Sequence, residues 1–559
     1  MTTINPRQIP KTPSAYMYPL LIKQLLHTPI RYSPDQEIVY RDQKRLTYRD
    51  FYNRINRLAS GLSSLGIGPQ DTVAVLDWDS HRYLECFFTI PMMGAIIHTV
   101  NVRLSPEQIL YTMNHAGDTA VLVHEDFLPL IENIAPQVST LKSIILLKDG
   151  DQAQTSSLVI NEEYEHMLDN ASDSYVFPDF DENTHATLFY TTGTTGDPKG
   201  CYYSHRQLTL HTLGMSIALA AFSGPVRFQS ADVYMPLTPM FHAHAWGMPY
   251  LATMMGCKQV YPGRYEPATI LKMLVSEKVT FSHCVPTILH MIISSPEAKN
   301  ADLSSWKIII GGSALPKGLA KASLERGIDV TSAYGMKGSL PLLTMANLTP
   351  EMMTRGLEAQ LEIRTKTGRP VPLVNLKIID PDGNAVAADG ASAGEIVVRA
   401  PWLTQGYLKA PEKSEELWHD GWLHTGDVAV MDSEGYVRVT DRFKDIIKTG
   451  GEWISSLELE SVISQHPGIS EVAVIGVPHE KWGERPAVLV VLRQESKDTF
   501  SVDDLRSFLQ QMVDKGQLSK WAIPDSVLIV HEIAKTSVGK IDKKLIRKKM
   551  VAGDYSSAS

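Results

Sequence analysis

The stretch YTTGTTGDPKG, from Tyr190 to Gly200, decides how the rest of the chain is interpreted. It contains four threonines and three glycines and then presents one lysine, Lys199. Threonine hydroxyls and glycine amides can wrap anionic oxygens, with the lysine ammonium as a point charge. The stretch is not a P-loop of the GxxxxGK[ST] type, because Pro198 stands directly before Lys199. A surface turn is the alternative interpretation when the stretch is taken alone.

Helical and strand patterns alternate on both sides of this stretch. A Thr47–Asp50 capping box and Gly66 bracket a run at helical spacing: Phe51, Ile55, Leu58, Leu62 and Leu65. Short apolar runs then read as buried strands: DTVAVL, TAVLV, SIILL, VTFSHCV and WKIIIGG. This alternation is typical of mostly parallel sheets covered by helices, so we predict the α/β class.

The pattern changes near TDRFKDIIKTGGEWISS, where a smaller unit begins. It holds two strand-like runs, EVAVIGV and AVLVVLR, and an amphipathic helix carrying Val502, Leu505, Phe508 and Leu509. A length of 559 residues also requires at least two domains. We therefore predict an N-terminal domain over 1–442 and a C-terminal domain over 443–559.

Composition excludes several function classes. The net charge of −9 is thinly spread and does not favour nucleic acid. The four cysteines lie far apart without metal-site or disulfide-framework spacing, which fits a reducing compartment. No apolar run reaches about 18 residues, and the N-terminus has no clean signal-peptide core, so we expect no membrane span and a cytoplasmic location.

Six ordered motifs together resemble the adenylate-forming superfamily of acyl-CoA ligases, luciferases and peptide-synthetase adenylation domains. They are YTTGTTGDPKG, GGSALP, YGM, GWLHTGD, DRFKDIIKTGGEWIS and TSVGKIDKK. GGEWISS and the chain length look most like the acyl-CoA ligases for medium-chain or unusual acids. The resemblance implies a large N-terminal acyl- and nucleotide-binding domain and a small, mobile α+β C-terminal domain. Members join a carboxylate to ATP, release pyrophosphate, and let a thiol displace AMP.

Carried over motif by motif, the resemblance implies two nucleotide-binding sets. The glycine loop would cradle phosphates through Thr191, Thr192, Gly193, Thr194, Thr195 and Lys199. Two other loops would frame adenine and the acyl group through Gly312, Ser313, Ala314, Tyr334, Gly335 and Met336. Asp427 would accept hydrogen bonds from the ribose, Arg442 would hold the nucleotide, and Lys444 would mark the hinge.

The resemblance also implies a catalytic lysine and an acyl site. Lys540 matches the lysine that neutralises charge between the attacking carboxylate and the α-phosphate. His242 stands where family members have an aromatic or histidine residue beside the acyl site, although a core histidine fits equally. Trp246 and Gly247 would shape the acyl pocket, whose few charged residues predict a hydrophobic acid. The basic residues after Lys540 either contact the phosphates of CoA or only aid solubility.

One motif departs from the family pattern. Members usually continue YGM with Thr-Glu, the threonine contacting the α-phosphate and the glutamate helping to bind Mg²⁺. This chain has Lys337 and Gly338 instead. Either Lys337 restores the charge balance by binding phosphate, or adenylation is weak or absent while CoA still attacks a supplied acyl-adenylate. The retained loop and Lys540 favour the first alternative, and the replacement favours the second. On balance we expect the second, a thioester-forming enzyme with weak or absent adenylation.

These alternatives determine the expected ligands and partners. We expect CoA, an acyl-adenylate or AMP, and ATP with Mg²⁺ only if adenylation is retained. A thioester-only enzyme would need a separate adenylating enzyme as its supplier. A carrier protein's phosphopantetheine arm in place of CoA, and a non-catalytic acyl-nucleotide or CoA sensor, stay open. Family members are commonly monomers or homodimers, and we expect the same here.

Overall fold

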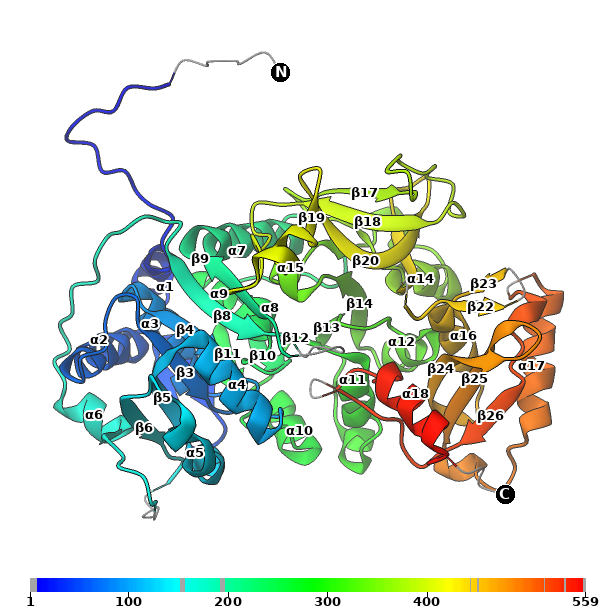
Figure 1. Cartoon of the computed structure of the whole chain (residues 1–559), viewed down its shortest axis with the longest axis horizontal. Coiled ribbons are helices and arrows are strands. Elements are labelled where there is room, and N and C mark those ends of the chain that lie inside the picture. Colours follow the sequence, from blue (N-terminus) through cyan, green and yellow to red (C-terminus); the bar gives the residue numbers. More distant parts are fainter. Residues whose placement is uncertain are drawn as a thin grey trace.

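The computed structural model describes residues 8–150, 156–191, 197–442, 444–449, 452–516, 518–536 and 539–555, with the backbone alone at 452 and 453. A large N-terminal body holds three sheets, and a smaller unit with its own sheet lies at one end of the molecule (Figure 1). The predicted α/β class is thereby confirmed. Residue 443 lies outside the described residues, and the domain boundary there stays a prediction.

The first sheet runs in the order β16-β15-β14-β13-β12-β10-β11-β1-β2. Its central strands β14, β13, β12, β10, β11 and β1 are parallel. The strands are β1 (Glu37–Tyr40), β2 (Lys44–Thr47), β10 (Val233–Leu237), β11 (Lys258–Tyr261), β12 (Phe281–Cys284), β13 (Lys307–Ile310), β14 (Asp329–Tyr334), β15 (Thr344–Met345) and β16 (Arg369–Pro370).

The second sheet runs in the order β7-β6-β5-β3-β4-β8-β9, and only the β8–β9 pair is antiparallel. The glycine loop joins the two antiparallel strands. The strands are β3 (Thr72–Leu76), β4 (Ile96–Thr99), β5 (Asp118–His124), β6 (Ser143–Leu147), β7 (Glu162–Glu163), β8 (His185–Tyr190) and β9 (Gly200–Ser204).

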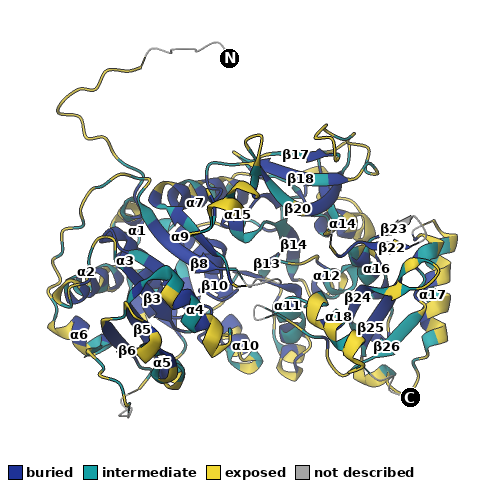
Figure 2. Cartoon of the chain, viewed as in Figure 1, coloured by how far each residue is buried: buried dark blue, intermediate teal, exposed yellow. Residues whose placement is uncertain are grey.

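Helices cover both sheets and fill the space between them. The largest apolar cluster joins residues of both sheets with helices α1 (His27–Tyr32), α2 (Tyr48–Ser64), α3 (His81–Met92), α7 (His205–Ala220) and α9 (Met248–Met254). The outer face of the first sheet packs on α10 (Pro267–Ser276), α11 (Pro286–Ile293), α12 (Lys317–Leu324) and α14 (Leu357–Arg364). The outer face of the second sheet packs on α4 (Pro106–Ala116) and α5 (Leu128–Ile134). Figure 2 shows the buried strands beneath exposed outer helix faces.

A third, antiparallel sheet completes the N-terminal body. Its strands are β17 (Asn375–Ile379), β18 (Gly394–Arg399), β19 (Trp418–His419), β20 (Trp422–Met431) and β21 (Val437–Arg442). Four short helices lie elsewhere in this body: α6 (Tyr164–Asn170), α8 (Ala243–Trp246), α13 (Pro350–Met353) and α15 (Pro411–Glu415).

The C-terminal unit has a five-stranded sheet in the order β23-β22-β25-β24, with β26 beside β25. Its strands are β22 (Ile447–Thr449), β23 (Glu452–Ile454), β24 (Ile469–His479), β25 (Gly483–Leu492) and β26 (Ser526–Ile529), and its helices are α16 (Ser456–Ile463), α17 (Val502–Asp514) and α18 (Lys543–Ala552). This unit lies beside α11 and α12 (Figure 1). The Thr287 Oγ1 hydroxyl of α11 donates to the Gly539 carbonyl at 2.6 Å.

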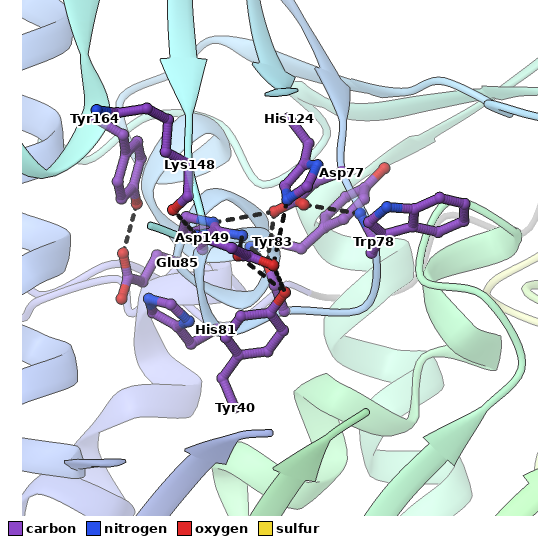
Figure 3. Close-up of polar contacts among 12 residues, drawn as sticks. Tyr40, Asp77, Trp78, His81, Tyr83, Glu85, His124, Lys148, Asp149 and Tyr164 are labelled. Atoms are coloured by element: carbon purple, nitrogen blue, oxygen red, sulfur yellow. Dashed lines mark hydrogen bonds and ion pairs between the residues drawn. The ribbon is translucent and has the colours of Figure 1, made fainter. Parts of the chain in front are cut away.

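A buried polar network joins the two large sheets (Figure 3). Tyr40 of β1 donates its hydroxyl to Asp149 at 2.9 Å, and Arg82 of α3 donates to the same carboxylate at 2.8 Å. Arg82 also pairs with Asp77 at 3.3 Å, while His124 of β5 lies 3.5 Å from Asp149. Because these groups come from both sheets, the network fixes one sheet against the other.

The local signals that the sequence offered are confirmed. The reciprocal Thr47–Asp50 capping box begins α2, and Gly66 adopts a φ of +78° just after that helix. The strand-like runs lie in β3, β5, β6, β12, β13, β24 and β25, and the C-terminal amphipathic run forms α17. Within the described residues, no helix is both long and apolar enough to cross a membrane.

Candidate active site

A cavity opens where the central strands of the first sheet end. Gly311 and Gly312 follow β13, and Ala333 and Gly335 flank Tyr334, the last residue of β14, so two neighbouring carboxyl ends contribute to it, as ligand sites in open α/β sheets do. Its lining comprises Met215, Leu219, His242, Trp246, Met248, His283, Ile309, Gly311, Gly312, Ala333, Gly335, Met336, Lys337, Pro341, Leu342 and Lys540. The cavity thus gathers His242, Trp246, Gly312, Gly335, Met336, Lys337 and Lys540 from the sequence-based set.

Most of this lining is apolar, and its histidines are neutral at physiological pH. Burial lowers the pKa of His283 to about 3, and its ring contacts Tyr234 and Thr238. Burial, aided by the nearby charges of Lys337 and Lys540, holds the pKa of His242 well below its usual value. The cavity therefore suits a hydrophobic group next to two ammonium groups.

A hydrogen-bonded cluster joins β14 to the third sheet. The Tyr334 hydroxyl donates to Asp427 Oδ2 at 2.6 Å, and Arg442 Nε lies 3.2 Å from Asp427 Oδ1. Asp427 is buried, whereas about half of the Arg442 side chain is exposed, at 53%. The three residues predicted to contact the nucleotide are thus brought together, with a carboxylate acceptor held by two donors.

Lys540 reaches this region from the C-terminal unit. A methyl group built on Gly312 would come within 2.8 Å of Lys540 Cε, so the lysine lies directly against the loop after β13. Burial and the charge of Arg442 lower the pKa of Lys540 to about 8, and Asp427 partly offsets this effect. The predicted catalytic lysine and the predicted nucleotide residues therefore share one site.

Lys337 lines the same cavity from the loop after β14. Its Nζ donates to the Tyr190 carbonyl at 2.8 Å, and its own carbonyl accepts from the Tyr203 hydroxyl. Tyr190 ends β8 and immediately precedes the glycine loop, so Lys337 connects the cavity to that loop. Burial, reinforced by the nearby charge of Lys540, lowers the pKa of Lys337 to about 7.

The glycine loop is described only at its two ends. Thr191 N donates to the Lys199 carbonyl at 2.8 Å, and Lys199 N donates to Thr191 Oγ1 at 3.2 Å, so the ends are tied together. Lys199 Nζ lies 5.0 Å from the centre of the Tyr407 ring. Thr192, Gly193, Thr194 and Thr195 lie outside the described residues.

The wall that carries Trp246 has a left-handed backbone. Ala243, His244, Ala245 and Trp246 have φ values of +48°, +55°, +46° and +58°, and Gly247 follows at +75°. Each non-glycine residue in this conformation costs about 1–2 kcal/mol. Surrounding contacts hold the segment, since His244 Nε2 lies 2.6 Å from Thr187 Oγ1. A side chain at Gly247 would also collide with His211 at 2.7 Å, so Gly247 supports this wall without lining the cavity.

Of the other predicted residues, Ser313, Ala314 and Lys444 do not line the cavity. Ser313 and Ala314 are exposed just beyond Gly312 and do not line it. Gly335 packs so tightly that a side chain there would come within 2.2 Å of the Pro341 carbonyl oxygen. Lys444 is exposed shortly after β21, at the start of the predicted C-terminal domain.

Sequence reasoning missed much of the apolar lining. Met215 and Leu219 are four residues apart on α7, a spacing that could have indicated one shared helix face. His283, Ile309, Pro341 and Leu342 carried no comparable signal, because only the sheet order brings them together. The contact between Lys337 and Tyr190 spans 147 positions and was likewise invisible.

Two family models match the chain. The model described as AMP-binding enzyme matches residues 26–408, and the model described as AMP-binding enzyme C-terminal domain matches residues 458–540. The chain belongs to the AMP-binding enzyme family. Tyr334 lies within the first matched range, and Lys540 is the last residue of the second.

Named relatives and solved structures match over nearly the whole chain. A long-chain-fatty-acid–CoA ligase of Thermus thermophilus is 38% identical, over 90% of both chains. A medium-chain-fatty-acid–CoA ligase of Ectopseudomonas oleovorans is 34% identical, over 95% of this chain and 96% of that one. The crystal structure of an anthranilate CoA ligase with anthranoyl-AMP superposes with a TM-score of 0.83 at 24% identity, over 95% of this chain and 98% of that one. The last match supports the adenylate-forming fold alone.

Proposed function

We propose that this AMP-binding enzyme is an acyl-CoA ligase for hydrophobic carboxylic acids that catalyses both halves of the reaction. In the first half the acid displaces pyrophosphate from ATP and becomes an acyl-adenylate. In the second the CoA thiol attacks the acyl carbon, AMP leaves, and the thiol proton passes to solvent. One observation carries the proposal: Lys540 lines an apolar cavity and lies near enough to Asp427 and Arg442 for their charges to shift its pKa.

The residues divide the work by their chemistry. Asp427 offers carboxylate oxygens to ribose hydroxyls and is oriented by Tyr334 and Arg442. Lys540 neutralises charge where the carboxylate and the α-phosphate approach each other. The apolar wall holds the acyl chain and excludes water, and neutral His242 adds no competing charge. The names of the relatives, ligases of long- and medium-chain fatty acids, support a hydrophobic acid.

The family's metal ion, Mg²⁺, does not fit the described lining of this cavity. Magnesium prefers carboxylate, water and phosphate oxygens. No aspartate or glutamate stands among the described lining residues, and Lys337 brings an ammonium group instead. No step proposed here therefore passes through a protein-bound metal.

A thioester-only enzyme is the second candidate. It is favoured by Lys337 and Gly338, which offer no metal-binding carboxylate, and sequence alone favours it over the complete ligase. Such an enzyme would take acyl-adenylate from a separate adenylating enzyme. The position of Lys540 against Gly312 favours the complete ligase, because this lysine serves adenylation most directly.

The test separates the two half-reactions on a panel of carboxylic acids and their preformed adenylates. Pyrophosphate release with ATP and thioester formation with CoA are followed in parallel, and a phosphopantetheinylated carrier protein replaces CoA in a second series. Both products with an acid such as octanoate are expected. Thioester from adenylate without pyrophosphate from any acid supports the second candidate. Neither product, together with tight binding of acyl-AMP or CoA, supports a sensor.

A further inference from the structure

Two ammonium groups share the cavity, and its described lining holds no carboxylate. Asp427, outside that lining, only partly offsets the conditions that disfavour the charge of Lys540. Lys337 enters from the loop after β14, and Lys540 enters from the C-terminal unit. Each cation lies in surroundings that disfavour its charge, and Lys540 adds to the cost for Lys337. An anion bound between them would remove this conflict, because opposite charges attract strongly where water is excluded.

Contacts on both sides fix where the Lys337 ammonium lies. Tyr203 of β9 holds its backbone carbonyl, and the Tyr190 carbonyl accepts from its Nζ at 2.8 Å. A lysine ammonium has three donors, and this contact uses one of them. Since Tyr190 ends β8 and Thr191 begins the glycine loop, Lys337 connects the cavity to the described start of that loop.

We propose that the Lys337 ammonium binds the adenylate phosphate in this enzyme, at the position where the family resemblance implies a threonine and a metal-binding glutamate. The inference rests on the proposed function and specifies its ligand contact. It holds for the complete ligase and for the thioester-only enzyme, because both bind an acyl-adenylate. Lys337 is here a binding residue for the phosphate, and Lys540 keeps its role at the reacting carboxylate.

Few of the ionisable groups around Lys337 change their charge near neutral pH, so few can make the binding of an anion depend on pH. The Cys201 thiol of β9, whose pKa burial raises to about 12, stays protonated, and His242 and His283 stay neutral. The Tyr203 phenol is buried, and its pKa lies well above 10.0. Lys337 and Lys540, with pKa values lowered by burial to about 7 and about 8, are left to titrate near neutrality.

Binding of an anion should therefore be coupled to proton uptake. Free Lys337 is only partly protonated above pH 7, and a bound phosphate favours its charged form, so the ligand draws in a proton. Affinity is then highest at low pH and falls as the pH rises through about 7 to 8. The substrate carboxylate is the competing anion, because it could meet the same ammonium.

The experiment uses the full chain and a hexyl ester of AMP, a phosphodiester that has no ionisation near neutral pH. Calorimetry in buffers of different ionisation enthalpy measures the affinity for hexyl-AMP and the number of protons taken up on binding. Each titration is done once with EDTA and once with Mg²⁺. Octanoate alone is titrated in parallel as the carboxylate ligand. Two variants remove the ammonium, Lys337→Met and Lys337→Gln. The control is Lys307→Met, because Lys307 lies on β13 and contacts Asp232 at 2.6 Å.

Wild-type protein is expected to bind hexyl-AMP equally with EDTA or Mg²⁺, with proton uptake at pH 7.5. Lys337→Met and Lys337→Gln should weaken binding by about 10- to 100-fold and lose most of the uptake, whereas Lys307→Met should change neither. The inference is overturned if both Lys337 variants bind hexyl-AMP as tightly as the wild type, or if they lose affinity for octanoate alone. It is also overturned if the wild type takes up no protons when it binds hexyl-AMP. Thioester formation from preformed octanoyl-AMP separates these failures: if it persists, only the inference is wrong, and if it is absent with no binding, the proposed function is wrong too.

Discussion

At the scale of single residues, Asp427 is where the nucleotide prediction can be tested most directly. Its two carboxylate oxygens accept from Tyr334 and lie near Arg442, so both partners lose an acceptor in Asp427→Ala. AMP affinity should fall by about 10- to 100-fold, since hydrogen bonds to charged groups contribute about 1.5–3 kcal/mol. Tyr334→Phe removes one donor alone and should have a smaller effect. Titration calorimetry measures both, and an AMP Kd within twofold of wild type in Asp427→Ala contradicts the assignment.

Substitution of Lys540, also a single-residue change, should affect the two half-reactions differently. In Lys540→Met, pyrophosphate release from octanoate and ATP should fall about 10²- to 10³-fold, the usual effect of losing one electrostatic contribution. Thioester formation from preformed octanoyl-AMP should be largely preserved. In the wild type the pyrophosphate rate should fall as pH rises through about 8, because Lys540 then loses its proton.

Exposed Lys544, on α18, provides a matched control for that substitution. Lys544→Met leaves the cavity unchanged, and its pyrophosphate rate should match the wild type. Equal losses in both half-reactions for Lys540→Met would instead indicate a structural role for Lys540.

At the scale of elements, α7 packs against Trp402 through one glycine. A methyl group on Gly214 would lie 2.7 Å from the Trp402 ring, which is fully buried. Gly214→Ala should destabilise the protein by about 1–2 kcal/mol, because overpacking of about 2–3 kcal/mol exceeds the helix-propensity gain of about 1 kcal/mol. Gly61→Ala of α2 meets flexible Met167 at the same 2.7 Å and serves as the control. A lower melting temperature is expected for Gly214→Ala, and equal values would contradict this account.

The elements also indicate how far sequence reasoning reaches. Thr47, Asp50 and Gly66 act on neighbours a few positions away, so their capping signals predicted the ends of α2 correctly. The sheet orders could not be read in this way, because β10 pairs with both β11 and β12, and β1 joins β11 across more than 200 positions. The same limit hid the contact of Lys337 with Tyr190. Motifs identified polar site residues, whereas packing of distant strands determined the apolar lining.

At the scale of the whole molecule, Asp149 holds the two large sheets together (Figure 3). Burial opposes its charge, but contacts with His124 and Arg82 outweigh burial and lower the pKa of Asp149 below its usual 3.8. A carboxyl group whose pKa is lowered in the folded state stabilises the fold at pH values above its unfolded pKa. This stabilisation is lost progressively as the pH falls from the unfolded pKa toward the folded one. Asp149→Asn should therefore cost about 3–5 kcal/mol at pH 7, the typical effect of breaking a buried ion pair.

The measurement for Asp149 is the melting temperature of both proteins between pH 3 and pH 7. The gap between wild type and Asp149→Asn should narrow as the pH falls below about 4, where the native carboxylate begins to lose its advantage. Asp498→Asn is a control outside the network, because Asp498 lies on an exposed turn of the C-terminal unit. A gap that stays constant with pH would mean that charge is not what Asp149 contributes.

The contact between the two units is expected to hold Lys540 at the cavity. The Thr287 hydroxyl donates to the Gly539 carbonyl at 2.6 Å, one residue before Lys540, and Ser470 Oγ lies 3.1 Å from His290 Nε2 on the same helix, α11.

Thr287→Val keeps the shape of the side chain but removes the donor, leaving a carbonyl without its partner at a cost of about 1–3 kcal/mol. This arrangement of the units should then be less populated. Pyrophosphate release should fall about 5- to 100-fold, while thioester formation from preformed octanoyl-AMP should change little. Thr269→Val, at a partly exposed site on the neighbouring α10, should alter neither rate. If Thr287→Val leaves pyrophosphate release unchanged, the contact at Gly539 does not control the position of Lys540. Other contacts of the C-terminal unit must then hold Lys540 at the cavity.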